Sequence, residues 1–292
     1  MNLLKRILVA IVFIPIIIFC IKSSYSFNIY KGINISFFDI LMIVIFILGN
    51  LELYHLLKNI EPQINGIIFL VSGLSLLIAS LFIKNAVIKI SFVYGFFLLS
   101  ASIMLIGMFI ILFSLLFSII RHNIQNAFKA ASLSVAGFFY VPVLSSLYIL
   151  IRQTEKADNY ILCFFIISWM TDVGAFIIGS LIGKRPLSRR VSSNKTVEGA
   201  IGGILFSVIT SLILFKLGYF SVSLKSILFL GIILSLTGQF GDLVESLIKR
   251  EAGVKDSGIL LAGHGGILDA LDSTIFNALP LLIYSLIRGG NF

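Results

Sequence analysis

The sequence is dominated by long apolar segments that carry almost no charge and are separated by short polar stretches. A helix of about 20 residues crosses the hydrocarbon core of a bilayer, which is roughly 30 Å thick. Only 12% of the 292 residues are charged, and the mean hydropathy is +1.09. These values exclude ordinary soluble, disordered and disulfide-scaffold proteins. We therefore predict an all-α, polytopic integral membrane protein.

The apolar segments indicate about nine transmembrane helices. They are expected at 7–21, 35–54, 66–83, 90–120, 132–151, 160–183, 199–219, 226–248 and 273–288. Gly107 lies within the longest segment and is a point at which that segment could divide. We expect the first segment to be retained as a span, because no small-x-small cleavage site follows it.

The distribution of basic residues favours a cytoplasmic N-terminus. The formal net charge is +9, and Lys and Arg concentrate in cytoplasmic loops. With the N-terminus inside, cytoplasmic segments hold thirteen of the 22 basic residues: Lys5, Arg6, Lys58, Arg121, Lys129, Lys184, Arg185, Arg189, Arg190, Lys195, Lys249, Arg250 and Lys255. Two spans separate the long polar loops 184–198 and 249–272, so both loops emerge on the same face of the membrane.

Acidic residues inside the apolar segments point to a functional site. Asp172 lies in the sixth segment, and Asp242 and Glu245 lie in the eighth. A carboxylate at the bilayer centre costs ~2.5–3.5 kcal/mol, so such groups usually pair, bind an ion or line an aqueous cavity. A hydrogen bond to a neighbouring helix is the alternative for Asp172. Helical spacing places Asp242, Glu245, Ser246 and Lys249 on one face, and an i, i+4 pair between Glu245 and Lys249 explains part of this pattern.

A glycine-rich stretch precedes the last apolar segment. The sequence Gly-His264-Gly-Gly allows the backbone to approach a ligand closely. Asp269 and Asp272 are expected to project together from the first turn of the last helix, where carboxylates beside phosphate-binding cations would suit Mg²⁺ with a nucleotide. Stabilisation of the helix N-terminus is the alternative for both carboxylates. For His264, a structural hydrogen bond within the loop is an interpretation at least as good as a catalytic role.

The loop 184–198 combines cations with hydroxyl side chains. Its Ser-Ser-Asn-Lys-Thr run is expected to open a helix, where free backbone N–H groups attract phosphate. A plain positive-inside loop explains the charges but not this run. The pair Gly179 and Gly183 does not have P-loop spacing, and close helix packing explains it better.

The 242–273 stretch resembles the signature of the phosphatidate cytidylyltransferase (CDP-diacylglycerol synthase) family. The matching positions are Ser246, Lys249, Arg250, Lys255, Asp256, His264, Gly265, Gly266, Asp269 and Asp272. Asp172-Val-Gly-Ala and Ser192-x-x-Lys195-Thr196-x-Glu198-Gly199 also resemble family segments, and the layout fits essentially the whole chain. Ala270 stands where the family has Arg, and Ala262 and Ser193 stand where Pro is usual.

The resemblance implies transfer of a cytidylyl group from CTP to phosphatidate, giving CDP-diacylglycerol and pyrophosphate in phospholipid biosynthesis. It implies Mg²⁺ as cofactor and leaves open a second cation. The implied metal ligands are Asp242, Asp269 and Asp272. The implied catalytic residues are Asp242, Lys249, Arg250, Lys255, Asp256 and His264. The implied substrate-binding residues are Asp172, Ser192, Lys195, Thr196, Glu198, Glu245 and Ser246.

We accordingly expect one integral-membrane domain over 1–292, with N-terminal helices in 1–131 and a catalytic part in 132–292. The expected partners are CTP, phosphatidate, membrane lipids and a second copy in a homodimer, without nucleic acid. The expected location is the cell inner (plasma) membrane, with the active site facing the cytoplasm.

Two alternatives to this function remain open. A CTP-dependent lipid kinase or a related lipid-phosphate nucleotidyltransferase would share the nucleotide-binding residues. A secondary transporter would also explain intramembrane carboxylates, but its polar residues should be dispersed at the midplane of two related halves.

Overall fold

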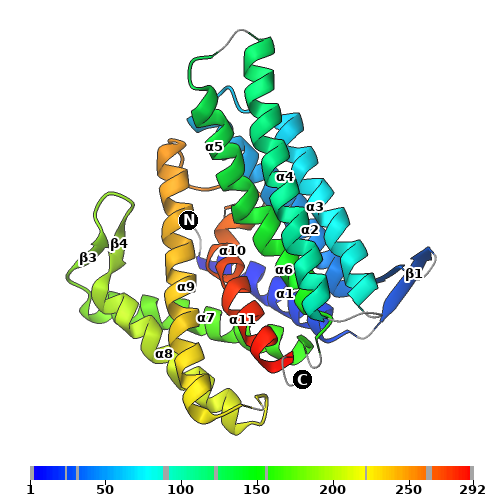
Figure 1. The fold of residues 1–292 in the computed structure, drawn as a ribbon. Coiled ribbons are helices and arrows are strands. Elements are labelled where there is room, and N and C mark those ends of the chain that lie inside the picture. The colour runs from blue at the N-terminus through cyan, green and yellow to red at the C-terminus, as the bar shows by residue number, and fades with distance from the viewer. Residues whose placement is uncertain are drawn as a thin grey trace. The chain divides into compact units, whose positions relative to one another are not determined.

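The computed structural model describes residues 3–23, 25–30, 33–87, 92–121, 124–154, 157–220, 222–260 and 265–289. These residues are mostly helical, and they include two short antiparallel hairpins (Figure 1). The hairpins add little to an architecture that is otherwise the predicted all-α, polytopic membrane fold.

Eight helical segments in the described residues are long and apolar enough to cross a membrane. They cover Phe37–Ile60, Gly66–Asn85, Tyr94–Ile120, Ala127–Ile151, Ala157–Ile182, Val197–Lys216, Leu224–Glu251 and Ile267–Leu286. Each contains or overlaps one of the predicted spans. The predicted span 7–21 falls within α1 (Leu3–Lys22), whose part Ile11–Lys22 is apolar but shorter than the other eight. The count of nine therefore stays a prediction. The longest segment is not divided at Gly107, because one helix runs through it.

The chain forms two compact units. The first unit comprises Met1–Thr154 and Glu251–Ala270, and the second unit comprises Glu155–Arg250 and Leu271–Phe292. A stretch from the C-terminal part of the sequence thus belongs to the unit of the N-terminal helices.

The first unit is built on the N-terminal helices, among which α2, α3 and α4 run side by side (Figure 1). Its elements after α1 are β1 (Ser26–Tyr30), β2 (Ile33–Ser36), α2 (Phe37–Ile60), α3 (Gly66–Val87), α4 (Phe92–Ile120), α5 (Ala127–Phe138), the π-helical turn η1 (Phe139–Val143) and α6 (Leu144–Ile151). Pro142 lies in the π-helical turn, where the missing proline N–H disturbs regular α-helical bonding. Large side chains such as Phe46 and Phe69 are fully buried between these helices.

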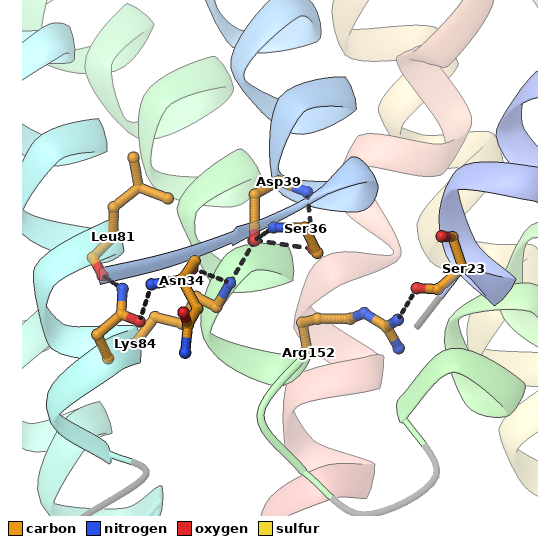
Figure 2. Close-up of polar contacts among 8 residues, drawn as sticks. Ser23, Asn34, Ser36, Asp39, Leu81, Lys84 and Arg152 are labelled. Atoms are coloured by element: carbon orange, nitrogen blue, oxygen red, sulfur yellow. Dashed lines mark hydrogen bonds and ion pairs between the residues drawn. The ribbon is translucent and has the colours of Figure 1, made fainter. Parts of the chain in front are cut away.

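A buried ion pair joins α2 to α3 in the first unit. Ser36 caps α2, and the Asp39 carboxylate accepts hydrogen bonds from the Ser36 backbone N–H at 2.7 Å and hydroxyl at 2.8 Å. Figure 2 shows the Lys84 ammonium between this carboxylate and the Asn34 carbonyl, to which it donates at 3.2 Å. The side chains of Lys84 and Asp39 are 6% and 0% exposed. Such a pair is tolerated in an apolar interior because each charge has a partner.

The second unit contains the elements from α7 onward, apart from the start of α10. They are α7 (Ala157–Ile182), β3 (Pro186–Ser188), β4 (Ser192–Thr196), α8 (Val197–Lys216), α9 (Leu224–Glu251), α10 (Ile267–Phe276) and α11 (Ala278–Gly289). The β3–β4 hairpin extends beyond the adjoining ends of α7 and α8 (Figure 1).

Small residues allow α7 and α8 to pack closely. A Cβ atom at Gly199 would lie 2.8 Å from the Ala175 carbonyl oxygen and 3.1 Å from the Gly179 Cα. A Cβ atom at Gly202 would lie 2.9 Å from the Gly174 carbonyl oxygen. These distances leave no room for a larger residue. Gly179, for which the sequence predicted close helix packing, faces Gly199 in this contact, so the prediction is confirmed for Gly179.

The polar loop before α8 differs from the sequence-based prediction. Ser192–Thr196 was expected to open a helix, but it forms β4, with Pro186 opposite Thr196 and Ser188 opposite Ser192. The helix begins only at Val197, and the Thr196 hydroxyl caps it by accepting from the Gly199 N–H at 3.1 Å. The backbone groups of β4 are used in hydrogen bonds to β3. The side chains of β4 are therefore the groups that remain to bind a phosphate.

Candidate functional site

A cavity of about 440 Å³ lies in the second unit between α7, α8, α9 and the β3–β4 hairpin. Its volume is within the range of small-molecule sites. The polar side chains in its lining include Asp172, Ser192, Asn194, Lys195, Thr196, Gln239 and Asp242. Four of the predicted substrate-binding residues therefore meet the predicted metal ligand Asp242 in one cavity.

An ion pair between Lys195 and Asp242 connects β4 to α9 within this cavity. Their side chains are 31% and 29% exposed, but the Lys195 Nζ atom itself is buried against the carboxylate. Asp172 on α7 accepts a hydrogen bond from the Ser273 hydroxyl at 3.2 Å. The interhelical hydrogen bond considered as an alternative for Asp172 is thus present, and Asp172 also lines the cavity.

Three carboxylates gather next to this cavity. Asp242, Glu245 and Asp272 each offer an oxygen atom, and these atoms all lie within 4.8 Å of one another. Glu245 is fully buried and pairs with Lys249 at 2.6 Å, which confirms that Asp242, Glu245 and Lys249 share one face of α9. Hard oxygen donors in this arrangement suit Mg²⁺, which takes one or two carboxylates and completes its shell with water and phosphate oxygens. Asp272 lies in the second turn of α10, not in the predicted first turn.

The hairpin next to the cavity is held at its base by Glu198. This carboxylate accepts hydrogen bonds from the backbone N–H groups of Lys184 and Arg185, both at 3.1 Å, and from Arg185 Nε at 2.9 Å. Arg250 Nε donates to the Val191 carbonyl at 3.4 Å. These contacts give Glu198 and Arg250 a role in placing the hairpin that carries Lys195.

The signature loop 255–269 belongs to the first unit. Lys255 and Asp256 are exposed on it, whereas His264 falls outside the described residues. Asp269 Oδ2 accepts hydrogen bonds from the Ser257 N–H at 2.7 Å, the Ser257 hydroxyl at 2.9 Å and the Gly266 N–H at 2.8 Å. The predicted metal ligand Asp269 therefore organises the loop and the start of α10, as the alternative for this residue anticipated. Ser246 on α9 is buried in the second unit.

Sequence reasoning missed Glu52, which contacts the signature loop from α2. It is 7% exposed and accepts hydrogen bonds from the Ser257 hydroxyl at 3.0 Å, the Ile267 N–H at 2.9 Å and the Leu268 N–H at 3.0 Å. An acidic residue inside the apolar segment 35–54 is a signal of the same kind as Asp172, and it was available in the sequence.

The fold and the cavity define a polytopic membrane protein in which a lysine and clustered carboxylates lie at one cavity. The model of the family described as the Cytidylyltransferase family matches residues 4–287. Because this match covers nearly the whole chain, the protein belongs to that family.

Curated relatives in staphylococci are named phosphatidate cytidylyltransferase. The relative in Staphylococcus saprophyticus is 44% identical over 184 residues, which cover 63% of this chain and 68% of the relative. The relatives in Staphylococcus haemolyticus and Staphylococcus aureus strain COL are each 50% identical over 130 residues, which cover 44% of this chain and 50% of each relative. The matched part thus spans about half the length of the latter two proteins.

Proposed function

We propose that this protein transfers the cytidylyl group of CTP to phosphatidate, forming CDP-diacylglycerol and pyrophosphate. The observation that carries the proposal is the juxtaposition of Lys195 and Asp242 in a cavity flanked by Glu245 and Asp272. Phosphate-binding cations beside oxygen ligands for a divalent cation are what a nucleotidyl transfer requires. Membership of the family and the names of the relatives support the same reaction.

The proposed chemistry needs no protein nucleophile. A phosphate monoester has a second pKa of about 6, so the phosphatidate phosphate is largely dianionic near neutral pH. One of its oxygens forms a bond to the α-phosphorus of CTP, while the bond from that phosphorus to the bridging oxygen of the β-phosphate breaks and pyrophosphate leaves. Catalysis then depends on alignment and on stabilising charge in the transition state.

The side chains of the cavity suit these two tasks. Lys195 offers an ammonium group to phosphate oxygens, and Ser192 and Thr196 offer hydroxyl groups from the same strand. Lys249 and Arg250 at the end of α9 add positive charge. On the strength of the sequence resemblance alone, we also propose Lys255, Asp256 and His264 as catalytic residues.

We also propose Mg²⁺ as the cofactor, held by Asp242, Glu245 and Asp272, with Asp269 as a further candidate from the sequence. The close approach of three carboxylates supports this assignment, because a divalent cation would offset their mutual repulsion. When bound, Mg²⁺ would neutralise charge on the phosphate oxygens of the nucleotide.

The proposed setting is the cell inner membrane, with the cavity open to the cytoplasm. The distribution of Lys and Arg supports this orientation, and a cytosolic nucleotide can then reach Lys195. We retain a homodimer as the proposed assembly.

An assay with purified protein in detergent tests the reaction. The protein should convert CTP and phosphatidate into a CDP-lipid, and omission of phosphatidate or chelation of the divalent cation should abolish the product. A folded preparation that forms no CDP-lipid with Mg²⁺ and both substrates would contradict the proposal.

A further inference from the structure

Glu52 is a buried carboxylate within the membrane-spanning helix α2, and it accepts hydrogen bonds from the signature loop and from the start of α10. The Ile267 N–H bonds to Oε1, while the Leu268 N–H and the Ser257 hydroxyl bond to Oε2. A charge in this position is costly unless it is fully hydrogen-bonded. Both oxygens of Glu52 accept hydrogen bonds here. A glutamine of the same shape has only one acceptor oxygen, so it could not accept all three.

The start of α10 depends on carboxylates because its own capping residue has no side chain. Gly266 precedes the first helical residue, Ile267. Asp269 reaches back to the Gly266 N–H at 2.8 Å, as the third residue of a capping box does. The next two N–H groups lack partners within the helix, and both donate to Glu52. Glu52 thus acts as a cap supplied by another helix.

The glycines around Glu52 make room for its carboxylate. A Cβ atom at Gly258 would lie 2.6 Å from Glu52 Oε1, and a Cβ atom at Gly266 would collide with both Glu52 and Ser257. Gly265 has a φ of 87°, which favours glycine. Glycines on both sides of the loop, at positions 258 and 266, are therefore needed to accommodate the Glu52 carboxylate.

We propose that Glu52 is a positioning residue for the transfer reaction: by capping α10 and holding Ser257, it fixes the signature loop that carries Lys255, Asp256 and Asp269. This role rests on the proposed function of the loop, but the contacts that define it are independent of any substrate. Ser257 links the two carboxylates, because its hydroxyl group lies within hydrogen-bond distance of both Glu52 and Asp269.

Hydrogen exchange of the substrate-free protein tests the positioning directly. In Glu52→Gln the new NH₂ group must face an N–H or hydroxyl donor, so the amides of Ser257, Ile267 and Leu268 should exchange about tenfold faster or more. Glu61→Gln is the matched control, because Glu61 is a buried carboxylate at the end of the same helix that pairs with Lys129 at 3.6 Å. The control should leave exchange in 257–268 unchanged.

Kinetics test whether this positioning serves the reaction. Glu52→Gln should lower kcat/KM for CTP about tenfold or more, and Glu61→Gln should not. In a Lys255→Ala background the same substitution should cost much less, because effects on one functional unit are not additive. A purely structural role would lower activity by the same factor in both backgrounds.

The outcomes separate this inference from the proposed function. Accelerated exchange confined to the loop supports the positioning role, even if the wild-type protein makes no CDP-lipid, in which case only the function falls. Unchanged loop exchange in Glu52→Gln, or acceleration spread over all helices, overturns the inference. If Glu52→Gln cannot be purified, Glu52→Asp provides the same test, because its carboxylate is one methylene too short for both amides.

Discussion

Lys195 on β4 and Asp242 on α9 form an ion pair inside the cavity of the second unit, 47 positions apart in a chain that holds few acidic residues. Each partner keeps about a third of its side chain exposed. Both residues line the cavity, so a bound ligand can replace either partner. We therefore expect substrate binding to break this ion pair, so that Asp242 contacts a cation and Lys195 contacts a phosphate.

Asp242→Asn should abolish most activity without unfolding the protein. The amide keeps the shape of the side chain but removes a negative charge from the cluster with Glu245 and Asp272, so turnover should fall about a hundredfold or more. The measurement is kcat for CDP-lipid formation at saturating CTP over a range of Mg²⁺ concentrations. Asp158→Asn, at the start of α7 and outside the cavity, is the control. Near-normal turnover in Asp242→Asn would mean that this carboxylate is only structural.

Ala270→Arg should raise kcat/KM for CTP. Ala270 is exposed, so a longer side chain fits without a clash, and it stands where the resemblance expects a guanidinium. A charge-assisted hydrogen bond is worth ~1.5–3 kcal/mol, which corresponds to a gain of about tenfold to a hundredfold at most. Compensation by Arg189 or Arg190 would make the gain smaller. Ala270→Gln adds length without charge and should give no gain. Equal values for the Arg and Gln variants would show that position 270 does not act on the nucleotide.

Lys84→Met should destabilise the first unit more than the double variant Asp39→Asn, Lys84→Met. The single change leaves the Asp39 carboxylate buried without its cation (Figure 2), which costs about 3–5 kcal/mol. Removing both charges restores part of this loss. Unfolding midpoints in the same detergent provide the comparison. An unchanged midpoint for Lys84→Met would contradict the view that the ion pair joins α2 to α3.

Arg189→Cys should report the orientation of the β3–β4 hairpin. Arg189 is exposed, whereas the native cysteines Cys20 and Cys163 are buried. In intact cells a membrane-impermeant maleimide should not label this position, and permeabilisation should permit labelling. Labelling in intact cells would place the hairpin outside the cytoplasm.

The membrane spans were predictable because apolar length alone determines them. Eight of the predicted spans correspond to long helices, and the face of α9 that carries Asp242 followed from helical spacing. The hairpin at Ser192–Thr196 was not predictable in the same way, because its strands are short and polar and hold together through backbone pairing.

Long-range contacts account for what the sequence missed at the site. Nothing local indicates that Glu52 caps a helix that begins more than 200 positions later. For Asp269 the sequence anticipated the bond to Gly266 at the start of α10, whereas its bonds to Ser257 depend on how the loop closes.

The fate of the phosphorus atoms of CTP tests the central claim most directly. Purified protein is incubated with phosphatidate, Mg²⁺ and CTP labelled at either the α- or the γ-phosphorus. Cytidylyl transfer predicts that the α-label enters the lipid and the γ-label leaves as pyrophosphate, in equal amounts. Entry of the γ-label into the lipid with release of CDP would contradict the account and identify a CTP-dependent lipid kinase.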